Sequence, residues 1–230
     1  MRRIAAVAIA IATLAACSNS TPAPSVNASS ELHEGAAAMA KLKTVSATLK
    51  IAKGTVSLQG FALVSAKTAV RLPADSDTTY TVKEQDILLS LEVVITGNKV
   101  YVHLPLSTLQ EASPAEAAVF PDMAKLFDAT TGLPAVIPAG SNPRYVSTDQ
   151  VAGQSAYQVA TTYTPEQVHG LLSQLNSSGP VAARVWVGAT DHQIRKAVLD
   201  GAFGDNSSDA AVEVDISGFD APVAITSPSP

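Results

Sequence analysis

The chain has little cysteine, few aromatic side chains and little charge. Among 230 residues there is one cysteine, aromatic residues make up 5% and charged residues 15%. A single thiol cannot form a disulfide within the chain, so an exported fold of this sequence depends on its packed core. The net charge is −5 and lysine and arginine form no cluster. Nucleic acid is therefore not expected as a partner, because phosphate binding needs clustered positive charge.

Motifs of common enzymes and metal sites are also absent from the sequence. It has no HExxH pair, no G-x-S-x-G elbow and no glycine-rich phosphate loop. The four histidines are dispersed, at His33, His103, His169 and His192. Asp200, Asp205 and Asp209 lie near glycines, but their spacing is not that of an EF-hand, and a solvated turn is the simpler interpretation. We expect neither an enzyme nor a metal or other cofactor.

The N-terminus has the parts of an export signal. Arg2 and Arg3 precede an apolar stretch that runs to Ala16, followed by the single cysteine, Cys17. The apolar part is about a dozen residues long, whereas a membrane-spanning helix needs about 20. We expect residues 1–16 to be a signal peptide that is removed. An incidental buried thiol is the alternative for Cys17, because free cysteine packs like a small apolar residue.

The run Leu14-Ala15-Ala16-Cys17 resembles the lipobox of bacterial lipoproteins. That resemblance implies cleavage before Cys17 and attachment of diacylglycerol to its thiol, which would place the protein on the outer face of the plasma membrane. Two or three acyl chains, at about 0.8 kcal/mol per buried CH₂, anchor a protein durably. Residues 17–29 are polar and interrupted by proline, so we expect a flexible tether there and a disordered tail at 227–230.

Residues 30–226 are long enough for one domain with a sizeable core. A helix is expected from Ser30, where Leu32, Ala36 and Met39 form one apolar face. Apolar and polar residues then alternate with the period of a half-buried strand. The predicted strands cover residues 44–51, 58–64, 69–72, 80–82, 87–95, 100–104, 183–187, 194–198 and 212–216.

Further helices are predicted between the strands. Short ones are expected over 113–120 and 121–127. The clearest begins at Thr164-Pro165-Glu166-Gln167, where threonine caps, proline suits the first helical position and Gln167 completes a capping box. Its buried stripe is predicted to consist of Val168, Leu171, Leu172 and Leu175. This order of elements is typical of an α+β fold with helices on one face of a curved antiparallel sheet.

Three stretches of this sequence resemble the mycobacterial LppX, LprA, LprF and LprG lipoprotein family. They are the Val-Trp-Val strand at 181–187 with the turn at 191–194, the C-terminal segment 212–223, and Leu-Phe-Asp-Ala-Thr-Thr-Gly-Leu at 126–133. The likeness runs along the whole mature chain. Phe219 stands in place of the family's usual tryptophan, and Asp128-Ala129 lacks its frequent proline. Neither change removes a chemical group, so we expect the fold and the pocket to be kept, with the width of the pocket left open.

The resemblance implies a half-barrel sheet with helices over its concave face and a large apolar cavity between these layers. The cavity would take the acyl chains of cell-envelope lipids or lipoglycans, with a membrane lipid exporter as a further partner. Alternating strand positions and the covering segments would line it. The predicted lining residues are Val70, Leu72, Val82, Leu89, Leu91, Val93, Val100, Val102, Leu104, Leu126, Phe127 and Leu133. Each of them is equally well explained as ordinary core.

No catalytic residue is needed to carry a lipid. Exposing acyl chains to water costs about 0.8 kcal/mol per CH₂, and an apolar cavity avoids that cost. The predicted function is therefore a membrane-anchored carrier that binds an acylated lipid or glycolipid and moves it between the plasma membrane and the outer envelope. The alternative is a non-catalytic cell-surface adaptor or scaffold with a filled core that binds proteins. The two differ in whether the purified protein contains lipid.

Overall fold

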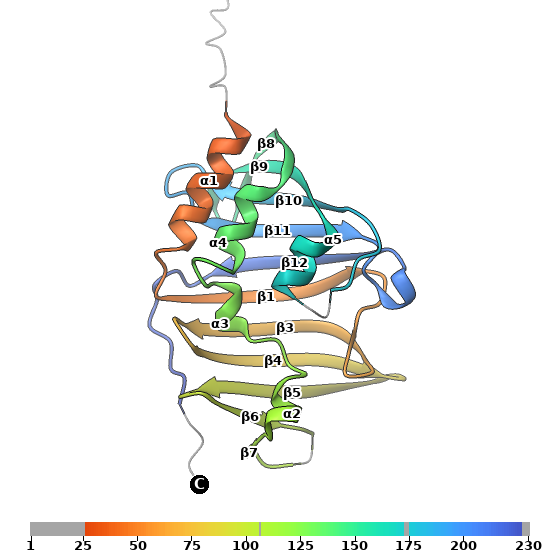
Figure 1. Ribbon diagram of the computed structural model, residues 1–230. Coiled ribbons are helices and arrows are strands. Elements are labelled where there is room, and N and C mark those ends of the chain that lie inside the picture. Colours follow the sequence, from red (N-terminus) through yellow and green to blue (C-terminus); the bar gives the residue numbers. More distant parts are fainter. Residues whose placement is uncertain (1–25, 106, 173–174, 227–230) are drawn as a thin grey trace, which may run out of the picture.

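The computed structural model describes residues 26–105, 107–172 and 175–226 (Figure 1). Twelve strands form one curved antiparallel sheet that stays open, and the helices lie over one of its faces. The predicted α+β half-barrel is therefore confirmed. Cys17, the predicted signal peptide and the predicted tail at 227–230 lie outside the described residues. Within the described part, no helix combines the length and the apolar character that crossing a bilayer requires.

The sheet has two open edges, formed by β7 and β8. From one edge to the other the strands are β7 (Gln110–Glu111), β6 (Lys99–His103), β5 (Ile87–Thr96), β4 (Asp75–Glu84), β3 (Phe61–Arg71), β1 (Thr44–Lys53), β12 (Ala210–Ser217), β11 (Ile194–Gly201), β10 (Val181–Gly188), β9 (Gln154–Tyr163) and β8 (Ser141–Val151). The short strand β2 (Ser57–Leu58) pairs only with the start of β3. The helices are α1 (Ala28–Met39), α2 (Pro114–Ala117), α3 (Met123–Leu126), α4 (Leu133–Val136), α5 (Pro165–Leu171) and the 3₁₀ turns η1 (Ile137–Ala139) and η2 (Asp205–Ser207).

Helix α1 begins two residues earlier than the sequence predicts. The side chain of Asn27 accepts hydrogen bonds from the backbone N–H groups of Ser29, at 3.1 Å, and Ser30, at 3.2 Å. Asparagine at this position satisfies donors that have no partner within the helix, so Asn27 and not Ser29 sets the start. The predicted apolar face is confirmed, because Leu32, Ala36 and Met39 are all buried.

The strand predicted over 58–64 is interrupted. Gln59 and Gly60 have positive φ values of 55° and 84° and form a tight turn between β2 and β3. Glycine adopts this conformation without strain, which the period-two pattern alone does not reveal. Strand β3 then continues to Arg71 and includes the separately predicted strand at 69–72.

Two long strands, β8 and β9, are not predicted from the sequence. They form a hairpin whose turn is Ala152-Gly153, with φ values of 50° and 77°. Edge strand β8 is mostly exposed, so its apolar and polar residues do not alternate clearly. A tight turn containing glycine, followed by the β-prone run Tyr157 to Tyr163, was the available signal.

The segment between β7 and β8 crosses the whole concave face. Residues 113–139, which we call the roof segment, include α2, α3, α4 and η1 and connect one edge strand to the opposite one (Figure 1). Helix α3 contacts β3 and β4, and α4 and η1 pack against α1. Helix α5 lies beside this segment on the same face. The sheet is therefore a floor, and short helices are its cover.

Candidate functional site

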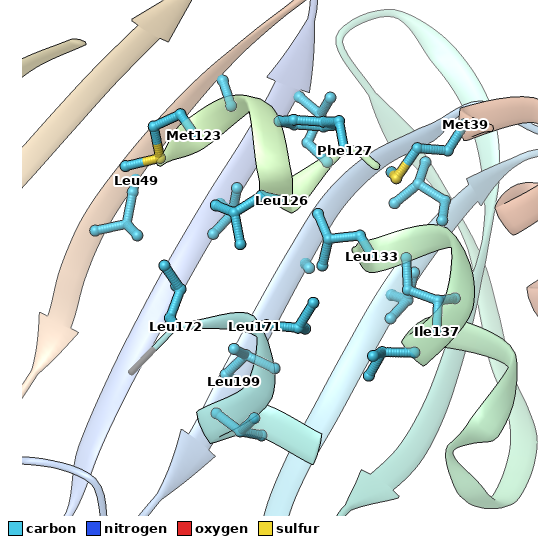
Figure 2. Close-up of a pocket in the computed structure, with 18 of the residues that line it drawn as sticks. Met39, Leu49, Met123, Leu126, Phe127, Leu133, Ile137, Leu171, Leu172 and Leu199 are labelled. Carbon is cyan, nitrogen blue, oxygen red and sulfur yellow. The ribbon is translucent and has the colours of Figure 1, made fainter. Parts of the chain in front are cut away.

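An apolar cavity of about 140 Å³ lies between the floor and the cover. Figure 2 shows Leu126 and Phe127 at the end of α3, Leu133 at the start of α4 and Leu171 at the end of α5 around this cavity. Its floor consists of Ala47, Leu49, Ala66, Thr68, Val185, Ile194, Ala197, Leu199, Val214 and Ile216. Its cover and sides consist of Met39, Met123, Leu126, Phe127, Leu133, Val136, Ile137, Tyr163, Val168, Leu171, Leu172 and Leu175.

Only two of the lining residues have a polar side chain, and both hydroxyl groups have partners. Thr68 Oγ1 lies 2.8 Å from Oγ1 of Thr78. The hydroxyl of Tyr163 donates to the backbone carbonyl of Ile137 at 2.9 Å, and burial raises the pKa of this phenol. Because both groups are satisfied within the protein, the cavity wall offers a ligand apolar contact only.

Helix α3 is short but well capped. Asp122 accepts hydrogen bonds from the N–H groups of Ala124, at 3.1 Å, and Lys125, at 3.3 Å. The cap fixes the direction of the first turn of α3, so that Met123 and Leu126 lie on the side of the helix that faces the floor. The predicted helix over 121–127 is therefore present in a shorter form.

The stretch from Leu126 to Leu133 is a compact loop held by one carboxylate. Asp128 Oδ1 accepts hydrogen bonds from the backbone N–H and the hydroxyl of both Thr130 and Thr131, at 2.7–2.9 Å. Hydrogen bonds first from Thr130 and then from Thr131 hold the pKa of Asp128 well below its ordinary value. This loop sets the relative positions of α3 and α4.

Glycine is required at the end of that loop. A Cβ at Gly132 would lie 2.5 Å from the carbonyl oxygen of Leu126 and 2.7 Å from those of Lys125 and Asp128. Backbone oxygens cannot yield as the end of a flexible side chain does. The close approach brings Leu133 directly behind α3, and so Leu126, Phe127 and Leu133 meet at one cavity wall.

Helix α5 closes the other side of the cavity. Its predicted capping box is present: Thr164 Oγ1 accepts from the N–H of Gln167, whose side chain accepts from the N–H of Thr164. Gln167 also donates to the carbonyl of Ala139 at 3.2 Å, which links α5 to the roof segment. The four residues of the predicted stripe, Val168, Leu171, Leu172 and Leu175, all line the cavity.

The prediction that α5 continues to Leu175 is wrong. The helix ends at Leu171, and Leu172 has extended backbone angles of −137° and 100°. Gly170 weakens the helix just before this point, because glycine has the lowest helix propensity apart from proline. The stripe therefore reaches the cavity from helix α5, which carries Val168 and Leu171, and from Leu172 and Leu175 beyond its end.

The structure divides the predicted lining residues into two groups. Leu126, Phe127 and Leu133 line the 140 Å³ cavity. The other nine lie on β3 to β6 or just beyond and are not among the residues that line it. Val70, Val82, Leu91 and Val93 are buried in filled core, Leu72, Leu89, Val100 and Val102 pack partly buried against that core, and Leu104 is 48% exposed. Contact of these nine with a lipid stays a prediction.

The concave face over β4 is filled by two aromatic rings. Tyr80 is 2% exposed, and its ring centroid lies 6.3 Å from that of Phe120 in the roof segment. The floor residues that sequence reasoning missed, such as Ala47, Ala197 and Val214, belong to β1, β11 and β12. Their alternation was recognised, but not which strands lie beneath the cover.

Two further cavities adjoin the first. One of about 730 Å³ has a mixed polar and apolar wall that includes Asn98, Val100, Asp122 and Lys125. The other, of about 50 Å³, is apolar and lies beside β2 and the start of β3. Leu172 lines all three cavities. This side chain therefore lies where the three spaces meet.

Two of the titratable residues considered in the sequence make contacts between elements of the fold. His192 contacts Glu31 at 3.3 Å and Glu34 at 2.9 Å, and so joins α1 to the turn after β10. Asp205 accepts hydrogen bonds from the backbone N–H and the hydroxyl of Ser57, which holds β2 in place. Among the described residues, no group of three or more histidine, cysteine or acidic side chains is placed to hold a metal ion.

Comparison with protein families now adds an independent observation. The profile of the LppX_LprAFG lipoprotein family matches residues 27–225, which include the floor, the roof segment and α5. The chain belongs to this family. The resemblance predicted from residues 126–133, 181–194 and 212–223 is thereby confirmed. Among curated proteins, none matched the sequence.

Two solved structures from mycobacteria have the same fold as this family member. LprF from Mycobacterium bovis is 19% identical, with a TM-score of 0.70 over 88% of this chain and 97% of LprF. LppX from Mycobacterium tuberculosis is 17% identical, with a TM-score of 0.62 over 86% of this chain and 97% of LppX. At these identities the likeness establishes the architecture, and the cavity of this chain must be interpreted from its own residues.

Proposed function

We propose that this lipoprotein binds the acyl chains of a cell-envelope lipid in the cavity between floor and cover and carries that lipid between the plasma membrane and the outer envelope. The observation that carries the proposal is the composition of the cavity wall. Its side chains are apolar apart from Thr68 and Tyr163, and both of these have hydrogen-bond partners within the protein. Such a wall stays dry and favours hydrocarbon.

The cavity must enlarge before it can hold a long acyl chain. A cavity of about 150 Å³ accommodates a molecule the size of benzene, so 140 Å³ is too small for a long acyl chain. The cover must therefore move outward when lipid enters. It is built for this, because α3 and α4 have four residues each and α5 has seven. Helices this short are held by packing and caps, not by their own stability.

The neighbouring cavities give the lipid room. Displacing Leu172 would join the 140 Å³ cavity to the spaces of about 730 Å³ and 50 Å³ on either side. The largest of the three has polar groups in its wall, including Asn98 and the Asp122–Lys125 ion pair at 3.2 Å. An amphiphile would thus find an apolar space for its chains beside a mixed one for its polar part.

Membership of a lipoprotein family supports attachment at the predicted site, Cys17. We propose that Cys17 carries diacylglycerol, that residues 1–16 are removed, and that residues after Cys17 tether the domain to the outer face of the plasma membrane. Anchor lipid and cargo lipid then have separate roles. Cys17→Ala should leave binding in the cavity intact and impair delivery.

The test is lipid content measured on a matched pair of variants. Protein purified from a mycobacterial host is extracted, and bound lipid is quantified by mass spectrometry against protein. Ala197→Phe fills the floor of the cavity, and Ala182→Phe adds the same ring at an exposed position of the neighbouring strand. We expect about one bound lipid per wild-type or Ala182→Phe chain and loss of lipid from Ala197→Phe. Lipid-free wild-type protein that also takes up none would favour an adaptor with a filled core.

A further inference from the structure

The apolar row on the concave face of β5 continues into solvent. Residues 87, 89, 91 and 93 share this face, and their burial falls toward the turn between β4 and β5. Val93 is 1% and Leu91 6% exposed, Leu89 is partly buried, and Ile87 is 64% exposed. Leu88 on the opposite face is 62% exposed. These two are the most exposed large apolar side chains among the described residues. We call Ile87 and Leu88 the apolar tip.

The apolar tip lies at the end of the strands where the cavity system reaches the start of β3. Leu88 pairs with Lys83, and Lys83 pairs with Ala62, the neighbour of Leu63. Leu63 and Leu58 line the 50 Å³ cavity, which shares Leu49, Met123 and Leu172 with the 140 Å³ cavity. The turn after β2 and the turn between β4 and β5 lie at the same end of the strands (Figure 1). The apolar tip is thus two strands from a cavity wall.

We propose that the apolar tip contacts the hydrocarbon edge of a lipid bilayer and positions this end of the cavity system for lipid exchange. This inference rests on the proposed function. Two neighbouring side chains with more than half of their surface exposed form a small apolar contact, and both lie at the first two positions of β5, next to the turn from β4, where this corner of the sheet can enter the headgroup layer.

The charges of the turn indicate which bilayer surface it fits. Lys83 pairs with Asp86 at 3.2 Å, and Glu84 leaves the turn with one negative charge in excess. Attraction to anionic lipids therefore does not drive the contact. Burial of apolar surface drives it, so that a neutral phosphatidylcholine surface binds at least as well as an anionic one and added salt has little effect.

Because the proposed lipid anchor at Cys17 already holds the protein at the membrane, the apolar tip needs only a weak contact with the bilayer. Fully extended, the chain from Cys17 to Val26 reaches about 30 Å. Strand β5 lies six positions from β10, next to which α1 packs, and six strand spacings are about 29 Å. Glu31 of α1 contacts His192 in the turn after β10, which the strand register places at the opposite strand end from the apolar tip. Because an upright strand of ten residues is itself about 33 Å long, the anchor and the tip reach the same bilayer when the strands incline toward it. Tethering turns the contact of the tip into an intramolecular step, which favours reversible contact without tight binding.

The first experiment measures depth in the membrane. Full-length chain from host membranes is reconstituted into phosphatidylcholine vesicles, with a bimane label on Leu88→Cys or, as control, on Val146→Cys. Val146 is 46% exposed and lies on the edge strand β8. Mass spectrometry confirms a single label per chain. We expect brominated phosphatidylcholine to quench the label at position 88 strongly and that at position 146 weakly. Equal quenching at both positions would overturn the proposal.

The second experiment measures rate and extent of lipid uptake separately, with pyrene-labelled triacylglycerol in donor vesicles as the probe. The double variant Ile87→Ser, Leu88→Ser is compared with Tyr145→Ser, Val146→Ser, which removes an adjacent exposed apolar pair from β8. We expect uptake by the first to be about tenfold slower with an unchanged end point, and the second to match wild type.

The outcomes separate this inference from the proposed function. Equal uptake rates for the two double variants would overturn the role of the apolar tip. So would a tip variant that changes only the oligomeric state in light scattering, since the tip would then contact a second copy of the chain. Failure of every form, wild type included, to take up the probe would count against the proposed function, and quenching at position 88 would still decide whether the tip meets the bilayer.

Discussion

The two halves of the sheet have the same alternating pattern of apolar and polar residues, but side chains fill the space over their concave faces to different degrees. Beneath α4 and α5, strands β1, β12, β11 and β10 present small and medium side chains such as Ala47 and Ala197, and a cavity remains. Over β4, Tyr80 and Phe120 pack against each other and Val82 is fully buried, so this half is filled between the 50 Å³ cavity beside Tyr80 and the 730 Å³ cavity beside Phe120. Alternation therefore predicts which residues face inward. The sizes of opposing side chains decide whether that interior is filled or empty.

The largest expected effect is on the cover of the empty half. Gly132→Ala would push a Cβ against three carbonyl oxygens, and we expect a loss of about 2 kcal/mol or more in the free energy of unfolding. Gly170→Ala is the matched control, because a Cβ there has no neighbour within 4 Å and alanine favours a helix. Urea denaturation of both variants measures the difference. Equal stability of the two would mean that the loop after α3 does not hold the cover.

A second pair of variants compares the filled half of the interior directly with the half that contains the 140 Å³ cavity. Val82→Trp overpacks the filled half and should cost about 1–3 kcal/mol while lipid uptake per folded molecule is kept. Ala197→Phe enters the existing cavity, and uptake should be lost with little change in stability. Denaturation curves and lipid content of each variant show which loss occurs. Loss of uptake in Val82→Trp at normal stability would place cargo over β4, as the sequence predicted.

Removing the hydroxyl groups of two buried tyrosines should change stability by smaller amounts, which differ between the two halves. Tyr163→Phe removes the 2.9 Å hydrogen bond to the carbonyl of Ile137, which then accepts only from the N–H of Gly140 at 3.5 Å, and we expect a loss of about 1 kcal/mol. The hydroxyl of Tyr80, in the filled half, has no hydrogen-bond partner among the described residues. Tyr80→Phe should therefore be neutral or slightly stabilising. Thermal unfolding by circular dichroism distinguishes the two, and a larger loss for Tyr80→Phe would mean that its hydroxyl has a partner such as buried water.

The smallest expected effect is the pH dependence of stability that Asp128 causes. The pKa of Asp128 is lower in the folded protein than its ordinary value of 3.8, so its carboxylate stabilises the loop above that pH and the contribution is lost as the pH falls toward the folded pKa. Asp128→Asn should lower the melting temperature slightly and by a constant amount at pH 5–8. The gap to wild type should narrow below about pH 4. A gap that widens in acid would contradict this sign.

Much of the fold follows from local patterns, and the missed parts have identifiable causes. The capping box at Thr164 and the apolar face of α1 are short-range features, and both are confirmed. The edge strand β8 is exposed and so lacks the alternation of a half-buried strand. Cavity residues on the cover were predicted because residues 126–133 resemble a family motif. The floor residues on β1, β11 and β12 were not predicted, since strand order and the aromatic packing over β4 depend on contacts distant in sequence.

The roof segment is attached at both ends to opposite edges of an open sheet. The contour length of this segment therefore sets an upper limit on the distance between the cover and the floor. Anything that lifts the segment must also draw the edges β7 and β8 toward each other, which increases the curvature of the sheet. Under the proposed function, sheet curvature and cargo volume are then mechanically coupled, and the length of residues 113–139 sets the largest lipid volume that fits beneath the cover.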